Sequence, residues 1–349
     1  MERIAFQFQA CLRSEAKIFL IKWGGARKWL FLVLPWFLIK AIWILVSKKP
    51  DLVYLNDGLL SVIGVILKIF KIPVIITIHG LDITYKNKLY QWLIPRCVSK
   101  LNRVISISSA TRKECLNRGV PEDKISIVPD GFRDQFYISE DKAGLRKEFT
   151  AKFDLDLKNK KILLSVSRLI ERKGIHWFVD NVIPILKCSS KDFIYFVAGD
   201  GVLYEQIKKI ISKKGLSNWV VLLGGVDDDL LMMLYNISDV LIMPNIPVAG
   251  DIEGFGVVAL EASSCKIPVI ASDLEGIKDV LLNGDMGTLV KPFDESDFKT
   301  QILNMLRDDI ARKKYGEKVR NLVLDNFSWE IILKRYLNIF KAEILTFNK

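Results

Sequence analysis

Short apolar runs alternate with longer amphipathic segments along most of the 349-residue chain. The runs are rich in Val, Ile and Leu, which is typical of strands that are buried on both faces of a sheet. The predicted strands of the first half cover residues 18–21, 52–55, 74–78, 104–107 and 125–128. Those of the second half cover residues 162–166, 193–197, 220–223, 240–243 and 269–271. Strands that alternate with helices indicate parallel sheets, so we predict an α/β protein of two Rossmann-like, doubly wound domains.

A polar stretch, residues 134–161, separates the two series of strands and has no β pattern. We therefore predict an N-terminal domain of residues 1–155 and a C-terminal domain of residues 156–335. Ligands of doubly wound sheets bind beyond the carboxyl ends of the strands. Residues that directly follow the predicted strands are accordingly the first candidates for function.

The most apolar segment begins at Trp29 and ends at Val46, and 16 of its 18 residues are hydrophobic. Proline favours the first turn of a helix, so we predict a helix that starts at Pro35 and has about a dozen residues, too few to span a bilayer. Trp36 and Trp43 are seven residues apart and share a face of this helix, and basic residues surround it. This composition is typical of a helix at a membrane interface. An ordinary helix packed on the first sheet is the main alternative, and a transmembrane span is the remaining one.

The net charge of +11 at pH 7 lies entirely in the first part of the chain. Residues 1–150 contain 24 Lys and Arg against 13 Asp and Glu, whereas residues 151–349 contain 27 of each class. The excess predicts an anionic partner for the N-terminal domain. We favour a membrane surface over nucleic acid, because the basic residues are interleaved with apolar ones and no nucleic-acid motif is present. The five scattered cysteines are typical of a reducing compartment, so we expect a cytoplasmic protein, peripheral on the inner face of the plasma membrane.

The strongest local motif follows the predicted strand 240–243. Glu253 precedes Gly254, Phe255 and Gly256, and the two glycines allow a tight turn and a close approach of the backbone to a ligand. A predicted helix follows, and Glu261 is its only charged residue up to position 264. A carboxylate among apolar neighbours needs hydrogen-bond donors, which sugar hydroxyls would supply. A capped surface helix that tolerates one Glu is the alternative.

Two further turns follow predicted strands in the second half of the chain. Arg168 and Lys173 come after strand 162–166, where two cations are placed to bind a diphosphate. Arg172 could take the same role, and we rank it below Lys173. Gly199 and Gly201 end strand 193–197 in a Gly-Asp-Gly turn, which would line a base or phosphate pocket. The spacing of this turn does not match the dinucleotide-binding fingerprint.

Candidate chemistry in the first half of the chain is limited to His79, which closes the predicted strand 74–78. A lone histidine is more often structural than catalytic. Two acidic pairs, at residues 154/156 and 227/229, resemble a D-x-D metal motif, but the second opens a predicted helix, where Asp227 would be a cap. We therefore expect neither a metal site nor a cofactor.

These motifs together resemble the retaining GT-B glycosyltransferases of family four, also called glycosyl transferases group 1. The resemblance rests on the E-x7-E element from Glu253 to Glu261, the S-R-L-x-x-x-K-G string that contains Arg168, the Ala-Gly-Asp-Gly turn and the pair His79-Gly80, all in the family's order. It implies a GT-B fold with a nucleotide-sugar donor held mainly by the second domain. A final helix over residues 336–349 would pack back on the first domain.

The resemblance also implies roles for single residues. Arg168 and Lys173 would hold the donor diphosphate, Glu261 the ribose, and Glu253 the donor sugar. The expected catalytic residues are Glu253, His79, Arg168 and Lys173. The expected donor-binding residues are Arg168, Lys173, Gly199, Gly201, Gly254, Phe255, Gly256 and Glu261. The implied reaction is a metal-independent transfer, with retention, to a membrane-proximal or lipid-linked glycan acceptor.

The chain departs from the family pattern at several positions. Ser167 and Cys265 stand where the family often has Gly, and Glu275-Gly276 replaces a frequent Gly-Gly pair, which would alter the choice of donor sugar. The sequence also begins in what resembles the family's first helix, so we expect the first strand and its glycine loop to be missing. Three other functions stay open: a nucleotide-sugar epimerase, a phosphorylase, or a non-catalytic nucleotide-sugar binder.

Overall fold

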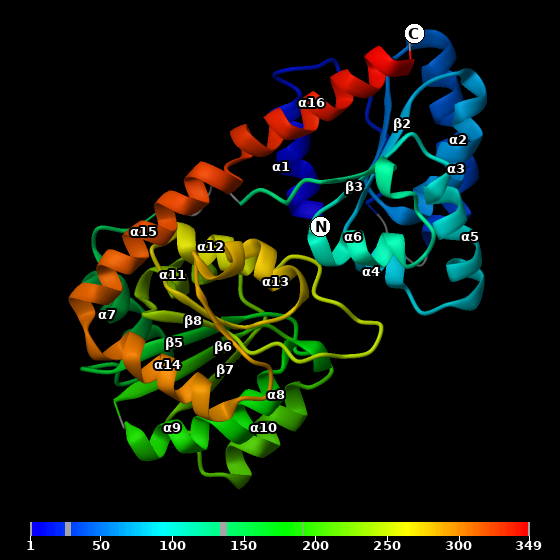
Figure 1. The fold of residues 1–349 in the computed structure, drawn as a ribbon. Helices are drawn as coiled ribbons and strands as arrows, with labels where there is room; N and C mark the ends of the chain where they lie inside the picture. The colour runs from blue at the N-terminus through cyan, green and yellow to red at the C-terminus, as the bar shows by residue number, and fades with distance from the viewer. Residues whose placement is uncertain (1, 25–28, 133–137, 191, 348–349) are drawn as a thin grey trace. The chain divides into compact units, whose positions relative to one another are not determined.

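The computed structural model describes residues 2–24, 29–132, 138–190 and 192–347 (Figure 1). The chain divides into two compact units: unit 1 contains Met1–Gly131 and Trp329–Lys349, and unit 2 contains Phe132–Ser328. The predicted boundary near residue 155 is therefore wrong. The polar stretch contains helix α7 (Lys142–Phe153), whose Phe149 packs on Phe196 of the second sheet. The return to unit 1 also comes earlier than predicted, at Trp329 rather than at residue 336.

Unit 1 contains a parallel sheet of four strands in the order β1-β2-β3-β4. The strands are β1 (Val53–Leu55), β2 (Val74–Ile78), β3 (Arg103–Ser106) and β4 (Ile125–Ile127). The predicted strand at residues 18–21 is wrong, because residues 17–24 have no regular secondary structure. An apolar run becomes a strand only where a neighbouring strand offers hydrogen bonds, and apolarity alone does not supply that partner.

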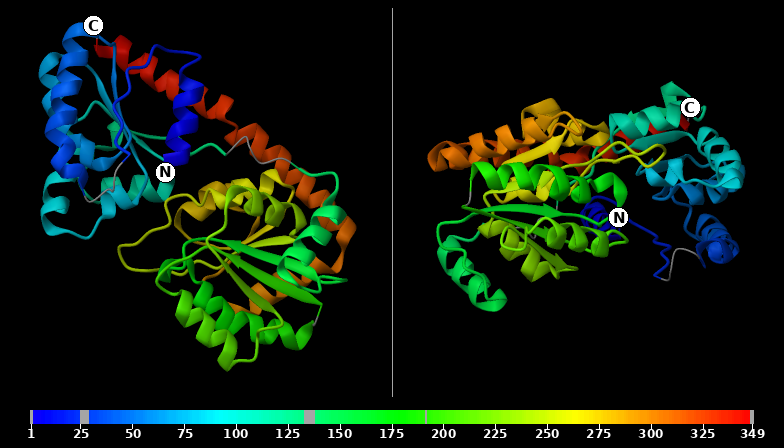
Figure 2. Two further views of the ribbon diagram at one scale, coloured as in Figure 1. Left: turned by 180° about the vertical axis from the view of Figure 1, so that it is seen from behind. Right: turned by 90° about the horizontal axis from the view of Figure 1, so that it is seen from below.

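Different helices cover the two faces of this sheet, because successive side chains of a strand point to opposite faces. Ile76 of β2 joins one apolar cluster, and Ile75 joins the other. The helices on the Ile76 side are α2 (Leu30–Lys48), α3 (Ser61–Leu67), α5 (Lys88–Ser99) and α6 (Ser109–Leu116). The helices on the Ile75 side are α1 (Glu2–Leu12) and α16 (Trp329–Phe347), seen in Figures 1 and 2. Short helices complete the unit: η2 (Gly58–Leu60), η3 (Lys68–Phe70), α4 (Leu81–Thr84) and η4 (Glu122–Lys124).

Helix α2 differs from the predicted helix in length. It has 19 residues, and Pro35 lies inside it rather than at its start. The helix extends before Pro35 because Val33 and Leu34, like Phe37, pack against the core of unit 1. Within the described part of the chain, no helix is both long enough and apolar enough to cross a membrane.

Unit 2 contains a parallel sheet of six strands in the order β10-β9-β8-β5-β6-β7. The strands are β5 (Lys161–Val166), β6 (Phe193–Ala198), β7 (Val220–Gly224), β8 (Val240–Met243), β9 (Val269–Ser272) and β10 (Thr288–Val290). The five strands predicted in this half are confirmed. The sequence pattern missed β10, a strand of three residues at the edge of the sheet. The order reverses between β5 and β8, and such a switch point is where doubly wound sheets bind ligands.

Helices on both faces of this sheet enclose a large apolar core, with Phe178, Phe193 and Tyr195 fully buried. After α7 come η5 (Glu171–Lys173), α8 (Ile175–Trp177), the π-helix η6 (Phe178–Val182), α9 (Ile183–Ser189), α10 (Tyr204–Lys213) and α11 (Asp228–Ile237). They are followed by α12 (Val258–Ser264), α13 (Glu275–Val280), η7 (Leu282–Gly284), α14 (Glu295–Arg307) and α15 (Asp309–Phe327).

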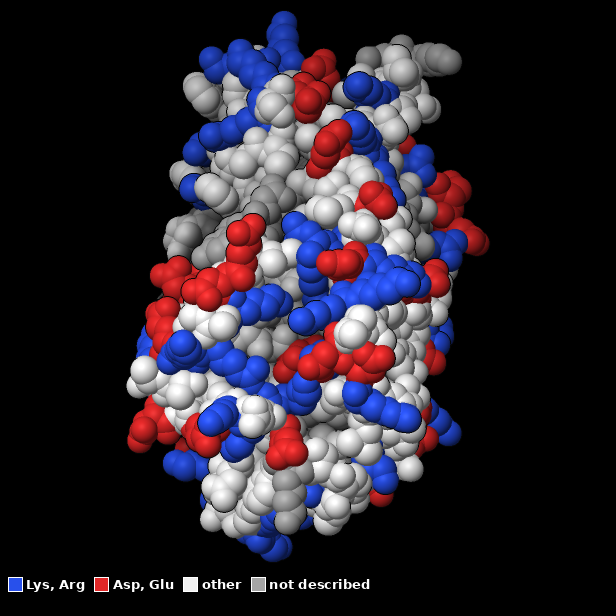
Figure 3. Space-filling view, turned by 90° about the vertical axis from the view of Figure 1, so that its left-hand side faces the viewer, with Lys and Arg blue, Asp and Glu red and all other residues white. Residues whose placement is uncertain are grey.

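Several ion pairs join the elements of unit 2. Arg312 of α15 donates to Asp239 at 2.7 Å and to Asp309 at 2.6 Å, and Lys161 also contacts Asp309. On the face of the molecule in Figure 3, Lys and Arg side chains are interspersed with Asp and Glu.

Candidate functional site

The candidate site of unit 2 lies at the switch point of its sheet. The loop after β5 carries Arg168, Arg172 and Lys173, and the loop after β8 carries Asn245 and Glu253. The two loops are packed together, because the amide of Ile246 donates to the carbonyl of Arg172 at 3.0 Å. A side chain on Gly174 would collide with the carbonyl of Pro244, 1.9 Å away, so only glycine allows this approach. The fold thus brings two distant segments to one edge of the sheet.

The carboxylate of Glu253 is the centre of this site. Its Oε2 accepts hydrogen bonds from Arg172 Nη1 at 2.7 Å, from Asn245 Nδ2 at 2.8 Å and from Lys173 Nζ. Glu253 is 8% exposed. Burial acts to raise the pKa of this carboxyl, but the charges of Lys173 and Arg172 prevail and lower the pKa below its usual value. Glu253 is therefore a buried, ionised carboxylate.

The three cations of the first loop have different surroundings. Arg172 is buried and also donates from Nε to Asp251 at 2.9 Å, so its guanidinium joins two carboxylates. Arg168 is exposed and has no ion pair among the described residues. Burial lowers the pKa of the Lys173 amine against the charge of Glu253, and the charges of Arg172 and, least, Arg168 lower it further, so Arg168 lies near this amine. Lys173 and Arg172 thus bind Glu253, whereas Arg168 faces solvent.

The Gly-Asp-Gly turn holds the backbone on either side of Arg168. A Cβ on Gly199 would lie 1.9 Å from the carbonyl oxygen of Ser167, and one on Gly201 would lie 2.4 Å from that of Leu169. The amide of Ser167 also donates to the carbonyl of Ala198 at 3.0 Å. The turn therefore fixes the main chain of Arg168 and leaves its side chain free to reach a ligand. A hollow beside the turn is lined by Asp200, Gly201, Val202, Tyr204, Glu205 and Gly224.

The segment after Glu253 is held mainly through its backbone. Phe255 is buried and its ring lies 5.8 Å from that of Phe327, so its side chain belongs to the core. Gly256 has a φ of +85°, which favours glycine. The amide of Glu253 donates to the carboxylate of Glu275, and the carbonyl of Glu253 accepts from the amide of Gly276 at 3.2 Å. Gly254 lies directly against Gly276. A Cβ on Gly276 would lie 2.1 Å from the carbonyl oxygen of Gly254.

Glu275 is the unexpected member of this group. It has a φ of +43°, a left-handed conformation that is strained for any residue with a Cβ. Burial raises the pKa of its carboxyl. The sequence marked Glu275 only as a departure from the family pattern, and the structure places it in contact with the backbone of Glu253.

Glu261 lies on α12, apart from the Glu253 cluster. It is 2% exposed, and the hydroxyl of Tyr235 donates to its Oε2 at 2.9 Å. The protein itself therefore supplies a donor for this buried carboxylate. Helix α12 has only seven residues.

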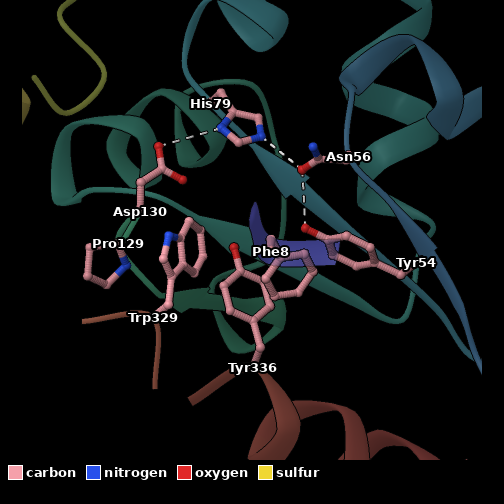
Figure 4. A pocket seen from close by; sticks show the side chains of 8 residues that line it. All are labelled: Phe8, Tyr54, Asn56, His79, Pro129, Asp130, Trp329 and Tyr336. Carbon is pink, nitrogen blue, oxygen red and sulfur yellow. Dashed lines mark hydrogen bonds and ion pairs between the residues drawn. The ribbon is translucent and has the colours of Figure 1, made fainter. Parts of the chain in front are cut away.

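His79 lies in unit 1, in a pocket between the sheet and helices α1 and α16 (Figure 4). Its Nε2 is 3.0 Å from Asn56 Oδ1, and because an amide oxygen only accepts, Nε2 carries a proton. Its Nδ1 lies 3.9 Å from the carboxylate of Asp130. Burial raises the pKa of Asp130 to about 7. The aromatic lining of the pocket comes from Phe8, Tyr54, Trp329 and Tyr336.

The described residues contain no group of three or more His, Cys, Asp or Glu side chains placed to hold a metal ion. The acidic group at 227–229 is partly accounted for, because Asp227 caps α11 by accepting from the amide of Leu230 at 2.8 Å. The interpretation of Asp227 as a helix cap is confirmed.

Comparison with known proteins decides the family. The sequence profile of the glycosyl transferases group 1 family matches residues 147–322, which is half of the chain. The chain belongs to this family. A second profile, glycosyltransferase family 4, matches residues 12–136. The resemblance noted in the sequence is confirmed on both halves of the chain.

Relatives and solved structures agree with this assignment. An uncharacterized glycosyltransferase of Methanocaldococcus jannaschii is 27% identical over 315 residues, covering 86% of this chain and 78% of the relative. The GDP-mannose-dependent phosphatidylinositol monomannoside mannosyltransferase of Mycolicibacterium smegmatis is 29% identical over 65% of this chain and 58% of its own length. The crystal structure of Anabaena HepE in complex with UDP has a TM-score of 0.74 at 20% identity, covering 87% of this chain and 82% of that one. This likeness confirms the predicted GT-B fold class.

The structure brings most of the predicted residues of this glycosyltransferase together in unit 2. Lys173 and Glu253 are in direct contact, and Gly199 and Gly201 pack against the backbone beside Arg168. His79 belongs to unit 1, and Glu261 is bound to Tyr235.

Sequence reasoning missed several contacts of these residues. Asn245 and Asn56 follow β8 and β1 closely, so the strand-end rule could have found both. Tyr235 lies on α11 and carried no signal, because a buried tyrosine on a helix usually belongs to the core. Arg172 was considered for the donor diphosphate, whereas the structure binds it to Asp251 and Glu253.

Proposed function

We propose that this glycosyltransferase transfers a sugar, with retention at the anomeric carbon, from a nucleotide-sugar donor held by unit 2. One observation carries the proposal: buried Glu253, its cations and exposed Arg168 meet at the switch point of the sheet. Nucleotides bind at this point of doubly wound sheets. The names of two similar proteins support the same donor class, since one is GDP-mannose-dependent and the other was crystallised with UDP.

Different residues of unit 2 bind different parts of the proposed donor. Arg168 binds the donor diphosphate, because it is the exposed cation of the loop and a guanidinium binds phosphate oxygens in pairs. Lys173, which is paired with Glu253, supplies a second positive charge for the diphosphate. Glu253 accepts hydrogen bonds from hydroxyls of the donor sugar, and Glu261 binds the ribose in addition to Tyr235. Gly254, Phe255 and Gly256 contact the donor through their backbone.

The chemical step needs charge stabilisation at the leaving group. As the glycosidic bond breaks, negative charge develops on the diphosphate, and preorganised cations lower the barrier by stabilising it. Arg168 and Lys173 supply that charge, which makes the proposed reaction metal-independent. The acceptor hydroxyl attacks from the face that the diphosphate leaves, and its proton passes to the departing phosphate oxygen. In this proposal His79 lies near the transferred sugar, and its Nε2 is held by Asn56.

For the acceptor, we propose a lipid-linked or other membrane-proximal glycan. The first part of the chain has a net charge of +11 over residues 1–150, which supports an acceptor that lies at an anionic membrane surface. We propose that the protein acts at the inner face of the plasma membrane. The name of the similar mannosyltransferase, which contains a phosphatidylinositol acceptor, points the same way.

The test combines donor binding with product analysis. Titration calorimetry of the purified protein with UDP-, GDP- and ADP-sugars identifies the donor, and incubation with polyprenyl-linked acceptors in EDTA tests metal-independent transfer. Proton NMR of the product gives the anomeric configuration, which we expect to match that of the donor. An inverted product, or activity that EDTA abolishes, contradicts the mechanism.

Two controls separate the other functions. Donor turnover without an acceptor indicates an epimerase, and turnover that requires inorganic phosphate indicates a phosphorylase. Donor binding with no turnover in any arm indicates a non-catalytic binder. Glu253→Gln should remove transfer while leaving nucleoside diphosphate binding close to that of the wild type, because the sugar and not the diphosphate contacts this carboxylate.

A further inference from the structure

Helix α2 has two apolar faces, and only one of them is used inside the protein. Phe37 and Leu45 are buried in the core of unit 1. The opposite face carries large apolar side chains that are each between 48% and 69% exposed: Leu32, Trp36, Ile39, Trp43 and Val46. Their spacing alternates between three and four residues, so they form one continuous line along the helix. We call this line the outer stripe.

The outer stripe is unusual for a protein surface. In unit 2 the described exposed large apolar residues are far apart in the sequence: Val202, Phe293, Ile310 and Leu324. Helix α3 lies beside α2, and the short helix η3 that continues α3 carries two further exposed apolar residues, Ile69 (78% exposed) and Phe70 (43% exposed). A contiguous apolar surface of this kind marks an interaction site, because exposing it to water is costly.

The charge around the stripe is of one sign. Between Glu15 and Asp51 the sequence contains seven Lys and Arg and no Asp or Glu. The Nζ of Lys40 lies 4.9 Å from the centre of the Trp36 ring, at the edge of the stripe. Lys48 and Lys49 are exposed at the end of the helix. Tryptophan and lysine side by side match the boundary of a bilayer, where the ring lies among lipid carbonyls and the amine contacts phosphates.

We propose that the outer stripe of α2 lies in the headgroup region of an anionic bilayer, with the helix axis along the membrane surface. A bilayer fits better than a second copy of this chain. A symmetric dimer through α2 would bring two equally basic segments together, whereas anionic lipids supply the opposite charge. This surface goes beyond the proposed transfer reaction, although it suits the proposed lipid-linked acceptor.

Vesicle flotation with the full chain tests the proposal without any donor or acceptor, so its outcome is independent of the transfer reaction. We expect binding to vesicles of phosphatidylcholine with 30% phosphatidylglycerol, weakened by high salt, and little binding to pure phosphatidylcholine. The variant Trp36→Ser/Trp43→Ser should lower the partition coefficient about tenfold or more. The variant Lys40→Gln/Lys48→Gln/Lys49→Gln should lower it about 100-fold, at roughly fivefold per lysine.

Matched controls come from exposed positions of unit 2. Ile310→Ser/Leu324→Ser removes two exposed apolar residues of α15, and Lys208→Gln/Lys209→Gln/Lys213→Gln removes three exposed charges of α10. Both controls should bind vesicles like the wild type. Circular dichroism confirms folding of each variant.

Three results with the wild type and the tryptophan variant would overturn the proposal. They are absence of vesicle binding, equal binding to neutral and anionic vesicles, and a dimer in sedimentation equilibrium that the double tryptophan variant converts to a monomer. The third result would assign the stripe to a second copy of the chain. Equal losses in the test variants and the controls would also contradict it, since binding would then follow composition and not the stripe.

Discussion

Arg168 and Arg172 stand four residues apart in one loop, and the structure predicts opposite consequences for their loss. Arg172 is buried and donates to Glu253 at 2.7 Å and to Asp251 at 2.9 Å. A hydrogen bond between charged groups contributes about 1.5–3 kcal/mol, and breaking a buried ion pair costs about 3–5 kcal/mol. Glu253 keeps Lys173 and Asn245, so we expect Arg172→Gln to lower the free energy of unfolding by about 2–4 kcal/mol. Arg172→Lys should recover part of this loss.

Arg168 is exposed, and its replacement should act on ligand binding instead of stability. Arg168→Gln should change the free energy of unfolding by less than about 0.5 kcal/mol. It should weaken nucleoside diphosphate binding by about 10–100-fold, because one charge-assisted hydrogen bond pair to phosphate is lost.

Urea denaturation followed by the fluorescence of the eight tryptophans measures the first quantity, and calorimetry with the nucleoside diphosphate measures the second. Arg335→Gln, at an exposed position of α16, serves as the control for both. The reasoning fails if Arg172→Gln is as stable as the wild type. It fails equally if Arg168→Gln binds the diphosphate normally, or if the two variants exchange their effects.

Three further predictions concern the buried carboxyls of Asp130 and Glu261 and the half-buried carboxyl of Glu275. Burial raises the pKa of Asp130 from 3.8 to about 7, so the free energy of unfolding of the wild type falls as the pH rises between these values. Asp130→Asn has no such loss. In urea titrations it should be more stable than the wild type at pH 8, by up to about 4 kcal/mol, and equally stable at pH 3.5. Tyr235→Phe removes the donor to buried Glu261 and should cost about 1–3 kcal/mol on urea denaturation, and an unchanged midpoint would show that this bond contributes nothing. Glu275→Gly relieves a left-handed conformation but frees the amide of Glu253, so stability should stay within about 1 kcal/mol while the preference among donor sugars changes. Competition assays with several donors measure that preference, and an unchanged preference would exclude Glu275 as a determinant of specificity.

Much of the fold was readable because strands in a parallel sheet are apolar throughout. Nine of the ten predicted strands exist, and two of them, β2 and β8, have the predicted bounds. The failures share one cause, since the pattern reports burial and not pairing. Residues 18–21 are as apolar as a strand but form none, and β10 is too short to give a pattern. The prediction for Pro35 failed for a related reason. Packing of α2 on the core outweighs the preference of proline for the first turn of a helix, so Pro35 lies inside α2.

The sequence by itself determined the class of fold, the family and the order of the functional loops, because strand ends, glycine turns and charged residues after buried strands leave a local pattern. Only the tertiary structure decided which of these charges are bound and which are free. Arg168, Arg172 and Lys173 read alike in the sequence, and they differ because β8 brings Asn245, Asp251 and Glu253 against the end of β5. The outer stripe has the same origin, since an apolar helix reveals which of its faces meets solvent only once the other face is packed on a core.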